Sequence, residues 1–188
     1  MAMNLAHKLC CSSDRWAKQV EDELLPWVLG DADLGDNTLE IGPGYGAILR
    51  VLVDKTPALT SVELDTPMAR RLEHLYGDRA RIINGDATNT GLPADEFSSV
   101  VSFTMLHHVP TVELQDALFA EAFRVLRPGG VFAGSASVAS LRFRLLHIRD
   151  TCNTVPPETL PDRLRAVGFH DVDVEVRGGR LRWRALKP

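Results

Sequence analysis

The chain has 188 residues, of which 45% are hydrophobic and 24% charged, and its formal net charge is −4. This length suits one domain, and the composition is typical of a folded globular chain rather than a disordered one. No apolar run is long enough to cross a membrane, and the N-terminal residues lack the features of a signal peptide, so we expect no membrane association.

The cysteines argue against several further classes of protein. Cys10, Cys11 and Cys152 form no CxxC pair, which argues against a zinc ribbon, an iron–sulfur cluster and a disulfide framework. We therefore expect no metal site. Cysteines used in this way favour the reducing cytoplasm.

A helix is predicted over residues 13–29, where apolar side chains recur at helical spacing behind a serine that can cap it. An acidic, turn-rich stretch follows, and then strands alternate with helices. The strands are predicted over residues 38–41, 59–64, 80–83, 97–105 and 131–136. Helices are predicted to begin near Ala47, Pro67 and Thr111, and the last of these is expected to end at Pro128-Gly129-Gly130.

Five repeats of strand and helix predict a parallel sheet with helices on both faces, a three-layer Rossmann-like α/β fold. The pattern changes after a helix at about residues 158–167. Residues 172–176 and 181–185 alternate between apolar and polar around a Gly-Gly turn, which predicts a closing antiparallel hairpin.

Charge is distributed unevenly along the chain. Residues 1–138 carry 11 basic and 19 acidic side chains, whereas residues 139–188 carry ten basic and six acidic ones. A basic region can attract an anionic substrate or nucleic acid, and a set of solvated faces is the simpler alternative. Arg180, Arg182 and Arg184 alternate with apolar residues, as on the outer face of a strand.

The strand at 38–41 leads directly into the loop Gly42-Pro43-Gly44-Tyr45-Gly46, which a helix follows. Glycines permit the turn and remove side chains that would block a ligand. The next strand ends in Glu63, whose carboxylate can accept hydrogen bonds from both hydroxyls of a ribose. Because ligands of open parallel sheets bind at the carboxyl ends of the strands, this arrangement indicates a ligand that contains adenosine.

Two cofactors contain adenosine and suit such a loop. The spacing of Gly42, Gly44 and Ala47 satisfies the loose dinucleotide fingerprint, so an NAD(P) oxidoreductase is one alternative. Three features favour S-adenosylmethionine instead. Glu40 can help neutralise the methionine ammonium, Asp86 can accept a hydrogen bond from the adenine amino group, and about 37 residues precede the first strand.

At this point the sequence resembles the class I S-adenosylmethionine-dependent methyltransferases. Five segments carry the resemblance in the expected order, namely LEIGPGYG (39–46), VELD (62–65), GDA (85–87), LHHV (106–109) and VLRPGG (125–130). The resemblance implies a seven-stranded sheet whose last strand is antiparallel. It also implies a single methyltransferase domain over 1–188, made of an N-terminal helical segment (1–37), a cofactor-binding core (38–136), a short insert (137–157) and a helix with the closing hairpin (158–188).

The resemblance implies that the glycines line the cofactor, that Glu63 holds its ribose and that Asp86 meets its adenine. With the residues beside these positions, the expected cofactor site comprises Glu40, Gly42, Gly44, Tyr45, Gly46, Glu63, Leu64, Asp86 and Ala87. Tyr45 is a candidate for contact with either the cofactor or the acceptor.

His107 and His108 lie where the loop after the fourth strand should meet the methyl group, and they are the expected catalytic residues. A general base is needed only if the acceptor must lose a proton. The structural alternative is that one of the two histidines caps the next helix or packs under the loop. Segments 1–30 and 137–157 are expected to form the acceptor pocket. Residues 141–147 would be an amphipathic lid or a surface helix docked by Leu141, Leu145 and Leu146.

The expected acceptor is a small molecule. An Asn-Pro-Pro-Tyr clamp for nucleic-acid amines is absent after the fourth strand, so a nucleic-acid partner is less favoured. An RNA or protein methyltransferase that uses the basic C-terminal region, and a scaffold that binds the cofactor without catalysis, are the alternatives. The acceptor atom and the oligomeric state remain open.

Overall fold

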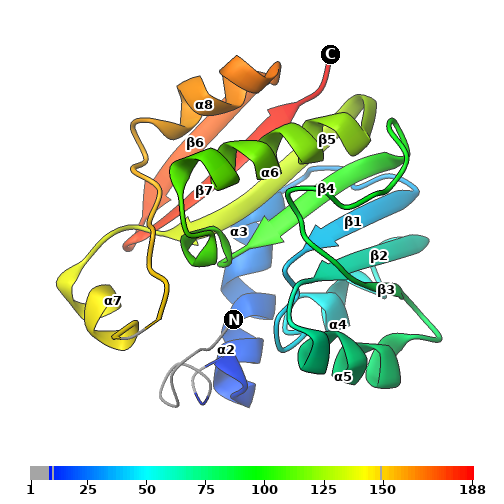
Figure 1. Cartoon of the computed structure of the whole chain (residues 1–188), viewed down its shortest axis with the longest axis horizontal. Helices are drawn as coiled ribbons and strands as arrows, with labels where there is room; N and C mark the ends of the chain where they lie inside the picture. Colours follow the sequence, from blue (N-terminus) through cyan, green and yellow to red (C-terminus); the bar gives the residue numbers. More distant parts are fainter. Residues whose placement is uncertain (1–8, 10, 149) are drawn as a thin grey trace.

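The computed structural model describes residues 9, 11–148 and 150–188, and over these residues it contains a seven-stranded sheet in the order β3-β2-β1-β4-β5-β7-β6 (Figure 1). The strands are β1 (Asn37–Ile41), β2 (Ala58–Glu63), β3 (Arg81–Asn84), β4 (Phe97–Phe103), β5 (Leu126–Ser137), β6 (His170–Arg177) and β7 (Arg180–Leu186). Neighbouring strands pair in parallel except at β7, which runs antiparallel to both β5 and β6. The expected sheet and its closing hairpin are confirmed.

Helices cover both faces of the sheet. One face carries α6 (Val112–Val125) and α8 (Leu160–Val167), which lie in front of the sheet in Figure 1. The other face carries α2 (Asp14–Gln19), η1 (Val20–Leu24), α3 (Leu25–Leu29), α4 (Leu49–Leu52) and α5 (Thr66–Tyr76). Each face buries its own apolar cluster, so the fold has the expected three layers. None of the helices in the described ranges is long and apolar enough to cross a membrane.

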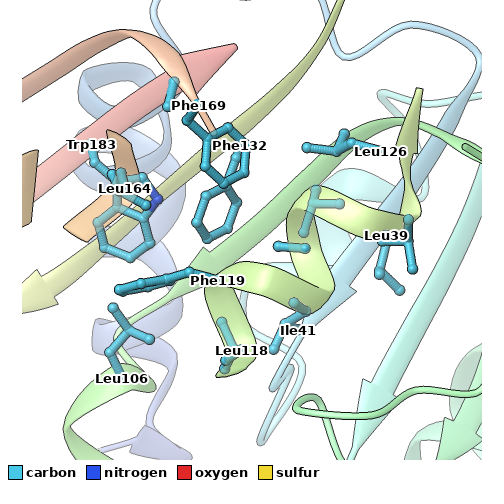
Figure 2. Packing of buried hydrophobic residues seen from close by; sticks show 14 of the residues in the cluster. Leu39, Ile41, Leu106, Leu118, Phe119, Leu126, Phe132, Leu164, Phe169 and Trp183 are labelled. Atoms are coloured by element: carbon cyan, nitrogen blue, oxygen red, sulfur yellow. The ribbon is translucent and has the colours of Figure 1, made fainter. Parts of the chain in front are cut away.

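Aromatic side chains form the centre of the core on the α6 face (Figure 2). The ring of Phe132 in β5 lies 6.1 Å from that of Phe119, 5.4 Å from that of Phe169 and 5.6 Å from that of Trp183. These separations are in the range in which aromatic pairs attract one another beyond their area of burial. Gly134 makes room for the largest ring, because a Cβ atom at this position would lie 2.3 Å from the Trp183 side chain.

Pro128-Gly129-Gly130 does not close the helix before it, as the sequence had suggested, but lies inside β5. Helix α6 already ends at Val125, since Leu126 adopts an extended backbone conformation and pairs with Phe97 in the sheet. The backbone N–H of Gly129 donates to the carbonyl of Lys187 at 2.8 Å, and Lys187 donates back to Gly130 at 3.0 Å. Contacts with the end of β7 therefore hold this segment in the sheet as a bulge between the pairs Leu126–Phe97 and Val131–Ser99, with Gly129 at a φ of +78°.

Two other boundaries differ from expectation. Strand β4 stops at Phe103 instead of residue 105, because Thr104 has a φ of +52° and turns the chain into the short helix η2 (Leu106–His108). The helix after the glycine loop is short, with turns over residues 44–48 before α4 begins.

The N-terminal helix is continuous in direction but changes its hydrogen bonding at η1, where the N–H of Leu25 donates to the carbonyl of Val20 five residues earlier. Pro26 follows immediately. It has no N–H to donate to the preceding turn, which accounts for the wider turn at this point.

The basic C-terminal region is not simply a set of solvated faces. Arg182 is 8% exposed and lies within 2.6 Å of Asp173 and 2.7 Å of Glu175 on the neighbouring strand. Arg180 and Arg184 are half-buried, so none of the three alternating arginines lies on a fully solvated face. Arg180 lies over the ring of Trp16 at 5.4 Å.

Candidate functional site

A cavity of about 630 Å³ lies at the carboxyl ends of β1, β2, β3 and β4. Figure 1 shows the arrowheads of β1, β2 and β4 pointing toward the side of the molecule where α2 lies. The volume falls in the range of ~300–1,000 Å³ that small-molecule sites usually have. The position is the one at which open parallel sheets bind ligands, next to the point where the strand order reverses.

The loop after β1 forms one wall of the cavity. Gly42, Gly44 and Tyr45 line it, while Gly46 lies behind them and packs against the helix α5. The three glycines have φ values of +70°, +54° and +82°, a region that side chains strongly disfavour. No atom lies within 4 Å of the position that a Cβ would take at Gly44, so the backbone is open to a ligand there.

Glu63 at the end of β2 lines the cavity and is 9% exposed. Its carboxylate oxygens accept hydrogen bonds from the backbone N–H groups of Gly44 at 3.0 Å and Asp65 at 2.9 Å. These bonds tie the glycine loop to the start of α5. An ionised carboxylate offers about four acceptor positions, so two hydroxyl groups can bind the same side chain.

Asp86 lies beyond β3 and also borders the cavity, together with Leu64 and Ala87. One carboxylate oxygen of Asp86 accepts from both the N–H and the hydroxyl of Thr88, each at 2.8 Å. The side chain therefore holds its own turn in shape. Leu64 is 51% exposed, which is unusual for a leucine and gives this part of the cavity an apolar surface.

Glu40 does not line the cavity. It is 2% exposed on β1 and accepts a hydrogen bond of 2.7 Å from the hydroxyl of Ser61. Burial raises the pKa of its carboxyl group to about 8, the Ser61 hydroxyl lowers it in part, and the nearby charge of Glu63 raises it further. At neutral pH this carboxyl group is therefore mostly protonated.

The opposite wall consists of the segment that follows β4. Thr104, Met105 and His108 line the cavity, whereas His107 does not and is 3% exposed. The Met105 side chain lies against the glycine loop, since a Cβ at Gly42 would come within 3.0 Å of it. Of the two expected catalytic histidines, only His108 borders the space where a ligand can bind.

Helix η2 is anchored by side-chain amides. Gln115 in α6 donates to the carbonyls of Leu106 at 3.1 Å and Asn153 at 2.9 Å. Asn153 in turn donates from its backbone to His107 at 2.8 Å and from its side chain to Val109 at 3.1 Å. The segment after α7 (Leu141–Leu146) is thus bound to the loop that carries both histidines.

Cys11, Trp16 and Val20 from the N-terminal helical segment complete the cavity. Segment 1–30 therefore contributes to the cavity, as expected, and Trp16 also packs against the core beneath it. No described residue of the insert 137–157 lines the cavity. Leu141 and Leu145 are 76% and 58% exposed, so these two leucines do not dock α7.

The structure thus brings most of the expected site residues to one cavity and leaves three outside its lining. Those that line it are Gly42, Gly44, Tyr45, Glu63, Leu64, Asp86, Ala87 and His108, and those behind it are Glu40, Gly46 and His107. Sequence reasoning missed Thr104 and Met105. No sequence pattern predicts the positive φ of Thr104. The position of Thr104 directly after an apolar strand, however, is a signal for the edge of the cavity.

Comparisons with known proteins agree with this architecture. Residues 39–134, about half of the chain, match the model of a family described as a methyltransferase domain. An uncharacterized methyltransferase of Geobacillus thermodenitrificans is 29% identical over 153 residues, which cover 80% of this chain and 63% of that protein. The ribosomal RNA small subunit methyltransferase A of Cupriavidus taiwanensis is 29% identical over 144 residues, or 65% of this chain and 50% of the relative.

Among solved structures, phosphoethanolamine N-methyltransferase 2 of Haemonchus contortus, in complex with phosphomonomethylethanolamine and S-adenosylhomocysteine, superposes with a TM-score of 0.71. It is 18% identical, and the match covers 91% of this chain and 53% of that one. The chain thus spans less than two thirds of the length of each of these three proteins. The family match and the shared fold agree with the resemblance seen in the sequence, and the chain belongs to the methyltransferase domain family.

Proposed function

We propose that this protein transfers a methyl group from S-adenosylmethionine to a small-molecule acceptor in the cytoplasm. The observation that carries the proposal is the 630 Å³ cavity, in which Glu63, the open glycine loop and Asp86 surround the same space. The free thiol of Cys152 suits a reducing compartment.

The residues around the cavity fit the cofactor. Glu63 would hold the ribose hydroxyls through the acceptor positions that its two backbone hydrogen bonds leave available. Gly44 would allow the cofactor to approach the backbone, and Asp86 would accept a hydrogen bond from the adenine amino group. The exposed side chain of Leu64 would pack against the adenine ring.

When bound, the cofactor supplies an electrophilic methyl group on a positively charged sulfur. The protein has to align the acceptor with this group and to exclude water, which by itself lowers the barrier of a displacement reaction. The walls formed by Trp16, Met105 and Leu118 are suited to this task because they are largely apolar. If the acceptor is a hydroxyl or a thiol, His108 would accept its proton.

A small-molecule acceptor is favoured over RNA by the way the basic residues are used. Arg163, Arg165, Arg182 and Lys187 pair with acidic side chains of this chain, at distances from 2.6 to 3.1 Å. Charges that are already paired contribute little to phosphate binding. An RNA substrate, as the name of the Cupriavidus relative suggests, predicts affinity that falls steeply with salt, whereas a small neutral acceptor does not.

Calorimetric titration with S-adenosylhomocysteine, with NAD as a parallel ligand, tests the cofactor assignment. We expect saturable one-site binding of S-adenosylhomocysteine and none of NAD. Preferential binding of NAD would establish an oxidoreductase instead. Tight binding of S-adenosylhomocysteine without turnover in an acceptor screen that includes RNA would favour the scaffold alternative.

Substitution of Glu63 tests the ribose assignment. Glu63→Ala is expected to weaken S-adenosylhomocysteine binding by about 1–3 kcal/mol, because charge-assisted hydrogen bonds are lost. Glu73→Gln is the matched control, since Glu73 is exposed on α5 and does not line the cavity. An unchanged dissociation constant in a folded Glu63→Ala protein would refute the assignment.

A further inference from the structure

Three histidines from two separate segments meet beside the cavity. One ring nitrogen of each of His107, His108 and His147 lies within 4.8 Å of those of the other two. His107 and His147 are each 3% exposed, whereas His108 is half-buried and lines the cavity. The cluster therefore lies between the core and the proposed acceptor space.

The rings are arranged to converge rather than to stack. The centroids of His107 and His108 are 4.1 Å apart with planes at 42°, and those of His107 and His147 are 4.8 Å apart with planes at 90°. His108 and His147 are 5.8 Å apart at 48°. Tilted rings allow nitrogens from three sides to point toward one position, which parallel rings do not.

The backbone on both sides of the cluster is fixed. Asn153, six residues after His147, donates from its backbone N–H to the carbonyl of His107 and is itself held by the Gln115 side chain. These hydrogen bonds tie the segment that follows α7 to η2. The three imidazoles are thus brought together by the fold, although nothing in their sequence spacing predicts it.

One of the imidazoles has its tautomer determined. Nδ1 of His147 lies 2.8 Å from the carbonyl oxygen of Phe143. A carbonyl oxygen only accepts, so Nδ1 carries the proton, and in the neutral ring Nε2 carries the lone pair. This is the arrangement found at most metal-binding histidines, where a backbone carbonyl or a carboxylate holds the other ring nitrogen.

We propose that His107, His108 and His147 form a binding site for one divalent transition-metal ion of the zinc type at the edge of the cavity. Imidazole nitrogens select Zn²⁺, Co²⁺ or Ni²⁺ over Mg²⁺ and Ca²⁺, which prefer oxygen ligands. Three protein ligands leave a fourth position of a tetrahedral ion open. Because His108 borders the cavity, an acceptor in the cavity could approach that position.

Metal binding requires only a small decrease in the distances between the three ligand nitrogens. Zinc–nitrogen bonds of ~2.0–2.1 Å in a tetrahedral site place the ligand nitrogens about 3.3 Å apart, so the nitrogens have to approach by up to roughly 1.5 Å. The role of the ion rests on the proposed function. An ion at this point would bind an acceptor hydroxyl or thiol and favour its ionisation. His108 would then act as a metal ligand and not as a base.

Metal binding is tested directly on the untagged protein after dialysis against a chelator. Co²⁺ is added as a spectroscopic probe, because its visible absorption distinguishes a tetrahedral site from hydrated ion, and Zn²⁺ affinity is measured by competition with a chromogenic chelator. We expect one ion per chain, and no displacement by Mg²⁺. His147→Ala and His108→Ala should each weaken Zn²⁺ binding by about 100-fold or more, since loss of an outer partner alone costs roughly 10–100-fold.

His74→Ala is the control, because His74 is an exposed histidine on α5 and should leave Zn²⁺ affinity unchanged. Thermal unfolding and S-adenosylhomocysteine binding verify that each variant is folded, and His108→Ala serves if the buried His147→Ala does not fold. Absence of a one-to-one site in the wild type, or equal affinity in the wild type and His108→Ala, overturns the inference. In the wild-type protein, S-adenosylhomocysteine binding without metal binding contradicts only this site, and metal binding without S-adenosylhomocysteine binding contradicts only the proposed function.

Discussion

Binding of the cofactor is expected to release a proton from Glu40. This carboxyl group is buried, and its pKa is raised from 4.5 to about 8, first because burial disfavours the charge. If the methionine ammonium of the cofactor comes to rest near it, the positive charge favours the ionised form. The carboxyl group then loses its proton as the ligand binds.

The number of protons released follows from the pKa of the Glu40 carboxyl group. With a value of about 8, roughly 0.9 of the Glu40 side chains are protonated at pH 7, so about 0.9 protons leave per bound ligand if ionisation is complete. Affinity should then rise by up to about tenfold per pH unit between pH 6 and 8, because less work is needed to ionise the group. The same raised pKa makes the folded state less stable as pH rises from 4.5 toward 8, since the unfolded chain gives up this proton more easily.

The assay is calorimetric titration with S-adenosylhomocysteine at pH 7 in buffers of different ionisation enthalpy. The slope of the observed enthalpy against the buffer enthalpy gives the number of protons released. Glu40→Gln, which retains an oxygen to accept from Ser61, should bring the slope close to zero, and the exposed Glu73→Gln should leave it unchanged. A slope near zero in the wild type, or the same slope in Glu40→Gln, would show that Glu40 does not ionise on binding.

Three further substitutions test how the fold supports the site. Gln115→Ala removes two hydrogen bonds, to the carbonyls of Leu106 and Asn153, and is expected to lower the free energy of unfolding in urea by about 1–3 kcal/mol. Turnover should fall more than S-adenosylhomocysteine affinity. Equal losses of turnover and affinity would contradict a positioning role. Glu121→Gln removes the negative charge that pairs with Arg124 and strengthens the hydrogen bonds from Thr90. These interactions lower the Glu121 pKa to about 2, so the stability deficit of the variant at pH 7 should shrink as pH falls from 4.5 toward 2; a constant deficit would count against this account. Phe132→Ala at the fully buried centre of the aromatic cluster should lower the free energy of unfolding by about 3–5 kcal/mol, and a loss below ~1 kcal/mol would show that the core repacks.

The order of strands and helices was predictable because it rests on local patterns. Buried strands such as β1 and β4 appear as short apolar runs, and the hairpin of β6 and β7 appears as alternation around Gly178-Gly179. The end of α6 was predicted too late because Pro128-Gly129-Gly130 has the composition of a helix stop. Its place in the sheet depends on hydrogen bonds with Lys187, about sixty residues away, which no local pattern reveals.

The candidate site likewise has parts that the sequence predicts and parts that it does not. Glu63 and Asp86 follow strands directly, so the topology alone places them at one edge of the sheet. The histidine cluster could not be predicted, because His147 reaches His107 only through the path of the chain after α7. Arg182 is buried against two acidic side chains of β6, and its place in an alternating sequence gives no sign of this pairing.

The inner position of β7 also has a consequence for synthesis of the protein on the ribosome. Domains emerge from the N-terminus at ~5–20 residues per second, yet β6 has no sheet neighbour other than β7, which is made after it. When residue 179 leaves the ribosome, β5 still exposes an open edge and β6 has nothing to pair with. A nascent chain cut short at that point would therefore present two unpaired strand edges, which makes it a substrate for chaperones and a source of aggregation rather than a slightly shorter enzyme.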